Sequence, residues 1–170
     1  MVARSKRWRI LILAAGCAVI LLMIWAGWRR YNSELQKETK RLILASDRVV
    51  VTTLRRNDDD IHENETFRVT EEAFREQLAG AIEFGDVYLA SWAISAAEAT
   101  KLEFFESGIR TLVLTLAGPP DDLSGGRITA IVQYGANPKE PIMADCTEDI
   151  YHIVRRKARQ IEAQKESQER

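Results

Sequence analysis

Carboxylates are the side chains of this sequence that are best placed for chemistry, and they gather in two segments. The first is the acidic run from 58 to 65, which also holds His62, and the second is the proline- and glycine-rich turn from 118 to 126. Hard cations such as Ca²⁺ and Mg²⁺ take oxygen ligands. The sharper hypothesis is therefore a divalent-cation site. Its candidate ligands are Asp58, Asp60, Glu63, Asp121 and Asp122.

The bland interpretation of the same carboxylates is a solvated acidic loop. Charged runs of this kind are common on protein surfaces. The spacing also departs from an EF-hand loop, because neither a glycine at the sixth position nor a glutamate at the twelfth follows Asp58. Both interpretations stay open at the level of the sequence.

No arrangement typical of an enzyme accompanies these carboxylates. Acid–base catalysis by a carboxylate pair needs one member buried with a raised pKa, and nothing in the pattern predicts such burial. His62 lies in the acidic run, His152 lies in the expected last helix, and the serines lack a Gly-x-Ser-x-Gly turn. We therefore expect a protein that is not an enzyme and binds no cofactor, and an enzyme using these carboxylates is the third hypothesis.

The longest apolar run extends from 10 to 28 and contains neither a charge nor a proline. The hydrocarbon core of a bilayer is about 30 Å thick, which a helix of about 20 residues crosses. Basic and aromatic residues stand at both ends, as they do at membrane–water interfaces. The candidate interface residues are Arg7, Trp8, Arg9, Trp25, Trp28, Arg29, Arg30 and Tyr31. We predict a transmembrane helix over 10–28 that follows a basic tail over 1–9.

Two alternatives for this segment agree less well with its sequence. A cleaved signal peptide has an apolar region of about 7–15 residues and small residues at its end, whereas this run is longer and ends in Trp25-Ala-Gly-Trp28. The run Leu13-Ala-Ala-Gly-Cys17 resembles a lipoprotein processing box, but the residues after Cys17 stay apolar. A signal-anchor is therefore the interpretation we favour.

The orientation of this anchor follows from the charges beside it. Cations flank both ends, so the count of positive charges is nearly balanced. Long domains translocate largely regardless of their charge, whereas a cytoplasmic domain would require the basic N-terminal tail to cross the membrane. We expect a cytoplasmic N-terminus and a domain outside the cytoplasm, which is the periplasm in a bacterium.

The rest of the chain has the length of one domain. We expect a juxtamembrane helix or linker over 29–46, an α/β domain with a mixed sheet over 47–163 and a polar tail over 164–170. The domain is predicted to follow the order β-α-β-α-β-β-α. The expected strands are 48–54, 87–94, 109–117 and 127–134, and the expected helices begin at Thr70, Ser95 and Asp145. Tight helix-to-strand joints at Gly85 and Gly108 indicate a partly parallel sheet with right-handed crossovers.

Charge and topology together limit the function. The net charge of −1 excludes a global basic field for nucleic acid. The first hypothesis is a membrane-tethered, non-catalytic binding or assembly module. Its expected partners are the lipid bilayer and a membrane or cell-envelope protein, and a homodimer is left open. The second hypothesis is an extracytoplasmic sensor or carrier domain that binds a small ligand or divalent cation where parallel strands end.

Overall fold

The computed structural model describes residues 2–57, 60–88, 98–117, 127–135, 141–147 and 149–168. The chain divides into two compact units, Met1–Leu35 and Gln36–Arg170. Helix α1 belongs to both units. In chain order the elements are α1 (Val2–Ala45), β1 (Arg48–Asn57), β2 (Asp60–Val69), α2 (Glu72–Ala81), β3 (Phe84–Tyr88), β4 (Glu98–Glu106), β5 (Ile109–Ala117), β6 (Arg127–Tyr134), β7 (Ile142–Thr147) and α3 (Asp149–Gln168).

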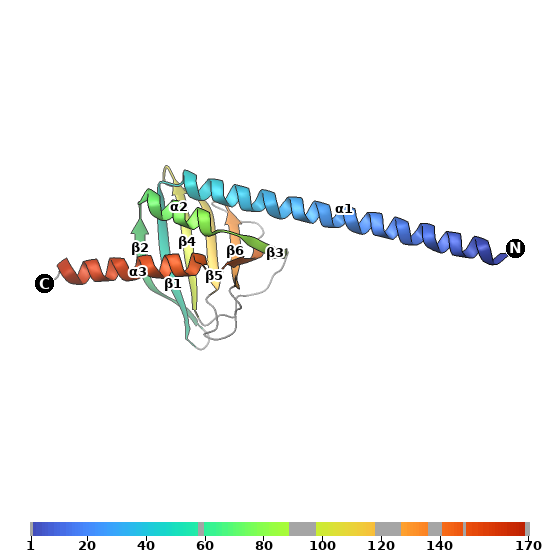
Figure 1. Cartoon of the computed structure of the whole chain (residues 1–170). Coiled ribbons are helices and arrows are strands. Elements are labelled where there is room, and N and C mark those ends of the chain that lie inside the picture. The colour runs from blue at the N-terminus through green and yellow to red at the C-terminus, as the bar shows by residue number, and fades with distance from the viewer. Residues whose placement is uncertain are drawn as a thin grey trace. The chain divides into compact units, whose positions relative to one another are not determined.

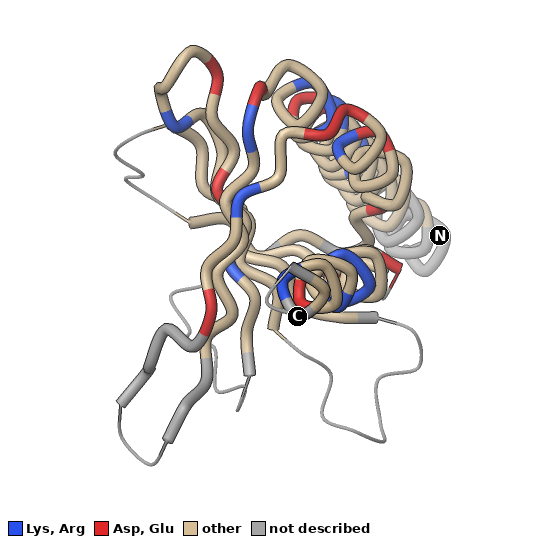
Figure 2. Tube along the Cα trace, turned by 90° about the vertical axis from the view of Figure 1, so that its left-hand side faces the viewer, with Lys and Arg blue, Asp and Glu red and all other residues tan. Residues whose placement is uncertain are grey.

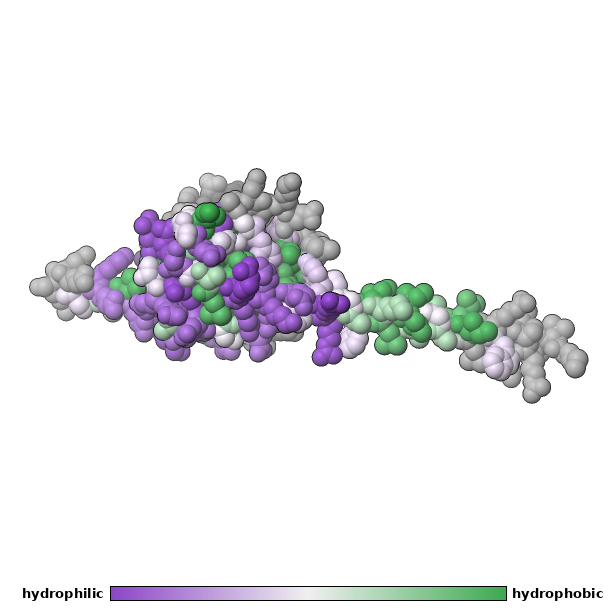
Figure 3. All heavy atoms as spheres, turned by 90° about the horizontal axis from the view of Figure 1, so that it is seen from above, coloured by the Kyte–Doolittle hydropathy of each residue, from purple (hydrophilic) through white to green (hydrophobic). Residues whose placement is uncertain are grey.

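The first unit consists of helix α1 up to Leu35. The run over 10–28 offers no proline and no charge to interrupt a helix. Its described large apolar side chains are exposed, from 41% at Trp28 to 70% at Met23. Figure 3 shows them as a band of hydrophobic surface on the helix. The chain therefore has an N-terminal helix long and apolar enough to span a membrane.

The second unit is built on one seven-stranded sheet with the order β2-β1-β4-β5-β6-β7-β3. Every neighbouring pair of strands in it is antiparallel. Alternate residues of each strand point to one face, so Leu102 of β4 lies between Val51 of β1 and Leu114 of β5. All three side chains are buried.

One face of this sheet is covered by helices. Figures 1 and 2 show α2, α3 and the last turns of α1 on the same side of the strands. The core between the two layers joins Ile43 of α1, Leu78 of α2 and Ile150 of α3 to the apolar rows of the sheet. Thr39 of α1 also reaches the sheet, since its hydroxyl lies 2.8 Å from that of Tyr134.

The opposite face of the sheet carries no helix in the part of the chain that the structure describes (Figure 2). Long polar side chains cover it instead. The guanidinium of Arg48 lies 4.5 Å from the ring centre of Phe105, and Glu103 bonds to Lys101 at 3.3 Å and to Arg110 at 2.7 Å. Val113 is only 2% exposed on this face, because the stems of such side chains shield apolar surface.

The prediction of a partly parallel sheet with helical crossovers was wrong. The segment from Ser95 to Gly108, expected as a helix, contains β4, and β4 forms a hairpin with β5. Ser107 and Gly108 have φ values of 53° and 82° and make its turn. Gly108 therefore reverses a strand instead of ending a helix. Most of the expected strand 87–94 lies outside the described residues.

Two further segments also differ from expectation. The polar run from 55 to 65, expected as a loop, continues β1 and forms much of β2, with a bulge between Thr53 and Leu54. Strand β7 was missed, and Asp145 lies in it instead of capping the last helix. Thr70 precedes the N-cap residue Glu71 of α2, which makes no side-chain capping bond.

The other expected elements are confirmed. The strands at 109–117 and 127–134 are present, and they pair antiparallel. Helices α2 and α3 occupy the expected regions, and α1 continues as a helix as far as Ala45.

Candidate binding groove

The candidate site is a groove between strand β2 and helix α3. On β2, Glu65 and Phe67 are two residues apart and therefore point to the same face of the sheet. This is the helix-covered face, because Phe67 belongs to the core between the sheet and the helices. Phe67 is paired with Val51 and is 9% exposed. Thr66 points to the other face, where its hydroxyl lies 3.3 Å from that of Thr52. The strand therefore presents one acidic and one aromatic side chain to the groove.

Helix α3 supplies the other wall. Ile150, Val154, Ala158 and Ile161 recur at helical spacing and face the core. The Nζ atom of Lys157 lies 2.6 Å from a carboxylate oxygen of Glu71, which ties α3 to the start of α2. This ion pair and the apolar stripe fix how α3 crosses the sheet. The residues between the apolar positions then place charges along the groove.

The groove contains a hollow of about 350 Å³ in front of β2. Its apolar floor is made by Phe67, Ala158 and Ile161, and its polar lining by Glu65, Thr66, Glu162 and Lys165. A second hollow of about 240 Å³ shares Glu65, Phe67, Ala158 and Glu162 with the first. It extends along α3 to Arg155 and Arg159 and along the sheet to Ala99 and Thr100.

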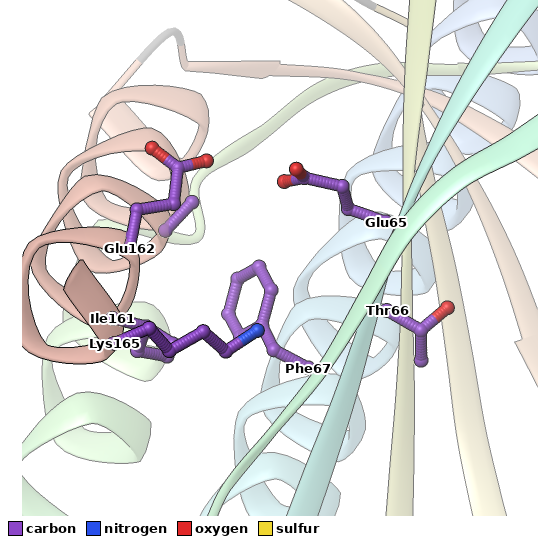
Figure 4. A pocket seen from close by; sticks show the side chains of 7 residues that line it. Glu65, Thr66, Phe67, Ile161, Glu162 and Lys165 are labelled. Carbon is purple, nitrogen blue, oxygen red and sulfur yellow. The ribbon is translucent and has the colours of Figure 1, made fainter. Parts of the chain in front are cut away.

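Two carboxylates face each other across the first hollow. Figure 4 shows Glu65 of β2 and Glu162 of α3 pointing toward one another from opposite walls. Neither carboxylate forms an ion pair or a side-chain hydrogen bond with any residue in the described ranges. The first hollow thus combines an apolar floor with two carboxylates and one cation, Lys165, whereas the second hollow adds Arg155 and Arg159. The space between the two carboxylates suits a cation of an occupant whose apolar part contacts the floor.

The carboxylates predicted from the sequence stand elsewhere. Asp58, Asp121 and Asp122 lie outside the described residues. Asp60 and Glu63 lie in β2, where the structure does not describe their side chains. The side chains that are described include no group of three or more metal-ligating residues. The proposed cation site therefore stays a prediction.

The sheet topology places the strand ends that flank the acidic run and the turn over 118–126. Asn57 pairs with Asp60, Arg55 with Glu98, and Ala99 with Ala117. The strand ends that flank the predicted segments therefore lie at the same end of the sheet. Their common position results from antiparallel hairpins, whereas the prediction derived it from parallel strands.

The predicted interface residues of the membrane segment all lie on α1. Trp8 is 65% exposed and Trp25 is 59% exposed. The guanidinium of Arg29 lies 5.4 Å from the ring centre of Trp25, and the rings of Trp28 and Tyr31 are 6.4 Å apart. Cationic and aromatic side chains therefore form two contacts at the C-terminal end of the apolar run, one between Arg29 and Trp25 and one between Trp28 and Tyr31.

Two titratable groups of the domain have shifted pKa values. Burial alone would raise the pKa of Glu103, but hydrogen bonds from Arg110 and Lys101 and their positive charges outweigh it and lower that pKa. Burial raises the pKa of the Cys146 thiol, although hydrogen bonds from the backbone near Glu83 and Thr147 oppose the shift. Glu103 is therefore a structural anion, and Cys146 is a core residue instead of a nucleophile.

The residues of the groove were not singled out by sequence reasoning. Glu65 was included only as part of the acidic run, and Ile161 only as part of the apolar stripe of the last helix. The alternation Glu65-Thr-Phe67-Arg-Val69 was the available signal for a strand with an acidic inward position. Comparison of the chain with protein-family models, curated proteins and solved structures gives no match.

Proposed function

We propose that this chain is a single-pass membrane protein whose α/β domain is a tethered, non-catalytic module that binds a partner protein at the membrane. The observation that carries the proposal is the apolar surface of α1. Its large side chains from Ile12 to Trp25 are exposed by half or more. Apolar surface of this extent needs a cover, and a bilayer supplies one along a helix of this length.

The direction of insertion is part of the proposal. The N-terminal tail carries Arg4, Lys6, Arg7 and Arg9 before the apolar run. Retention of this tail in the cytoplasm places the domain outside, in the cell envelope. Partners within reach of the tether are then membrane or envelope proteins.

The groove between β2 and α3 supports a binding role for the domain. A hollow of about 350 Å³ with an apolar floor falls in the range of recognition sites. Its described side chains include no group of three or more residues that could bind a metal ion. Binding is therefore the activity that the geometry supports best.

In-cell photocrosslinking tests this proposal. A photoreactive amino acid is placed in the full chain at Ala158 in the groove, at Gln77 on α2 or at Thr129 on the helix-free sheet face. We expect membrane-retained chain and a discrete crosslinked protein from at least one position. A chain from which residues 2–30 are deleted should lose both membrane retention and most of the crosslinking. Absence of crosslinks from all three positions would contradict partner binding.

A further inference from the structure

The two edges of the sheet differ in how their backbone groups are hydrogen-bonded. At the β3 edge, the side-chain amide of Gln36 donates a hydrogen bond to the carbonyl of Ile82 at 3.2 Å and accepts one from the amide of Phe84 at 3.4 Å. It thereby occupies the amide of Phe84, a backbone group at the start of β3 that another strand could use. At the other edge, the backbone of β2 pairs with β1 alone within the described part of the chain. Edge strands with unpaired backbone groups are templates for another strand.

Helix α3 extends over the open edge. Figures 1 and 2 show that α3 crosses the strands and that its C-terminal end projects past β2. Ile161 still packs against the core beside Phe67. The seven residues from 162 to 168 add about 10 Å of helix beyond that point, whereas neighbouring strands are about 4.8 Å apart. This C-terminal part of α3 is therefore long enough to cover one additional strand beside β2.

The side chains below this part of α3 define what an added strand should carry. A strand beside β2 places alternate side chains next to Glu65 and Phe67, two residues apart on the groove side. Glu65 and Glu162 face each other there without an ion pair among the described residues. Lys165 also lines this hollow but forms no ion pair with either carboxylate among the described residues. The two carboxylates therefore favour a further cation between them, and the ring of Phe67 favours an apolar side chain.

We propose that the β2 edge and α3 form a receptor for an extended peptide segment of a partner protein, which adds to the sheet as an eighth strand. The segment carries Lys or Arg opposite Glu65, between the two carboxylates, and a large apolar side chain two positions away against Phe67. Recognition by strand addition takes its affinity from backbone bonds and its specificity from alternate side chains. This inference rests on the proposed partner-binding function and names its surface.

A second copy of the chain is a poorer occupant of the edge. Pairing of two β2 strands would bring the inward carboxylate of Glu65 against the apolar or acidic residues of an identical strand. An inward-pointing charge on an edge strand deters such pairing. The bulge opposite Thr53 and Leu54 also divides the edge into two regular segments, Asp60 to Glu63 and Glu65 to Val69. A short basic and apolar segment matches the length of the second one.

Peptide selection on the full chain in lipid nanodiscs tests the proposal. Phage-displayed random linear peptides are selected against these nanodiscs and counter-selected on empty ones. We expect the selected peptides to share a Lys or Arg separated by one residue from a large apolar residue. The combined Glu65→Lys and Glu162→Lys variant should weaken their binding by about tenfold or more, because it replaces attraction by repulsion.

Matched variants separate the groove from general effects. Glu76→Lys makes a similar change of charge on an exposed position of α2 and should leave binding unchanged. Replacement of the basic residue of the peptide by Glu should restore binding to the reversed variant. Bound peptide should also slow amide hydrogen exchange over residues 65–69, because strand addition covers the outer edge of β2.

Three results would overturn the proposal: no enriched peptide, equal binding to the reversed variant, or unchanged hydrogen exchange in β2. Crosslinks between two copies of the chain at Ala158 would also overturn it in favour of a dimer. Crosslinks to a partner from Gln77 or Thr129 combined with a failed selection would reject the groove and leave the partner-binding function standing. Failure of both experiments would reject both.

Discussion

Glu103 shows how one carboxylate stabilises a sheet face that no helix covers among the described residues. Its side chain is 16% exposed and bonds to Arg110 at 2.7 Å and to Lys101 at 3.3 Å. Each cation also covers apolar surface of the neighbouring strands. A partly buried carboxylate with two cationic partners stabilises the fold more than an exposed ion pair does.

The stability that Glu103 supplies should depend on pH. Its pKa lies below the ordinary value of 4.5 in the folded chain. The contribution is therefore fully present above the unfolded pKa and disappears as the pH falls through the folded pKa. We expect Glu103→Gln to lower the free energy of unfolding by about 1 kcal/mol at neutral pH. The loss should shrink as the pH falls below about 4.5.

Urea unfolding of the full chain in detergent, followed by circular dichroism, measures this difference. Glu76→Gln on the exposed face of α2 is the matched control, and surface substitutions of this kind change stability little. A loss for Glu103→Gln that is equal at pH 7 and at pH 3 would contradict the assigned role.

At the scale of elements, the two edge strands β3 and β2 differ in whether their outer backbone groups have partners among the described residues. The amide of Gln36 holds the start of β3, whereas β2 pairs with β1 alone among the described strands. Proteins commonly protect edges of this kind with charges, bulges or covering segments. Strand β2 has a bulge and an inward carboxylate, which restrict its pairing without removing it.

Gln36→Ala should therefore destabilise the β3 edge. Two backbone groups lose their partners, which costs about 1–2 kcal/mol of unfolding free energy in total. Alanine favours the helical state more than glutamine does, so helix propensity would offset part of this loss. Gln77→Ala, at an exposed position of α2, is the control and should change stability little. Hydrogen exchange over residues 82–88 measures the effect, and unchanged exchange there would contradict it.

The errors in predicting these elements have physical causes. The segment Ser95-Ala-Ala-Glu98 has a helix-starting pattern, yet Leu102 and Phe104 alternate with Lys101 and Glu103 as in a strand. Pairing on both sides, with β1 and β5, overrides the local preference. The continuous β-branched run of β1 and the apolar stripe of α3 have no such conflict, and both were predicted.

The groove depended on information that the sequence does not carry locally. Glu65 and Glu162 are almost a hundred positions apart, and they meet only because α3 crosses the sheet as far as β2. The crossing is fixed by packing of Val154, Ala158 and Ile161 against the core. Patterns along the chain predict that α3 has an apolar face but do not specify which strand that face meets.

At the scale of the whole molecule, the chain combines an apolar helix with a domain that carries a groove. We propose that a bilayer covers the exposed side chains of α1 and that the groove binds a protein segment. A membrane tether would confine the domain to partners near the membrane and raise their effective concentration. On this proposal, a modest affinity of the groove for a peptide would be sufficient.

Thiol labelling of intact cells tests the central claim most directly. Single cysteines are introduced as Ser5→Cys in the N-terminal tail and Gln164→Cys on α3, with Cys17 and Cys146 changed to alanine. Alanine suits position 146 because the native thiol is buried in the core and alanine buries no polar group there. The reagent is impermeant to the membrane and small enough to reach it through outer cell layers.

We expect the Gln164→Cys variant to be labelled in intact cells and the Ser5→Cys variant to be labelled only after lysis. This result would place the two ends on opposite sides of the membrane and the domain outside. Labelling of both variants in intact cells, or of neither before lysis, would contradict a membrane-spanning α1 with an external domain.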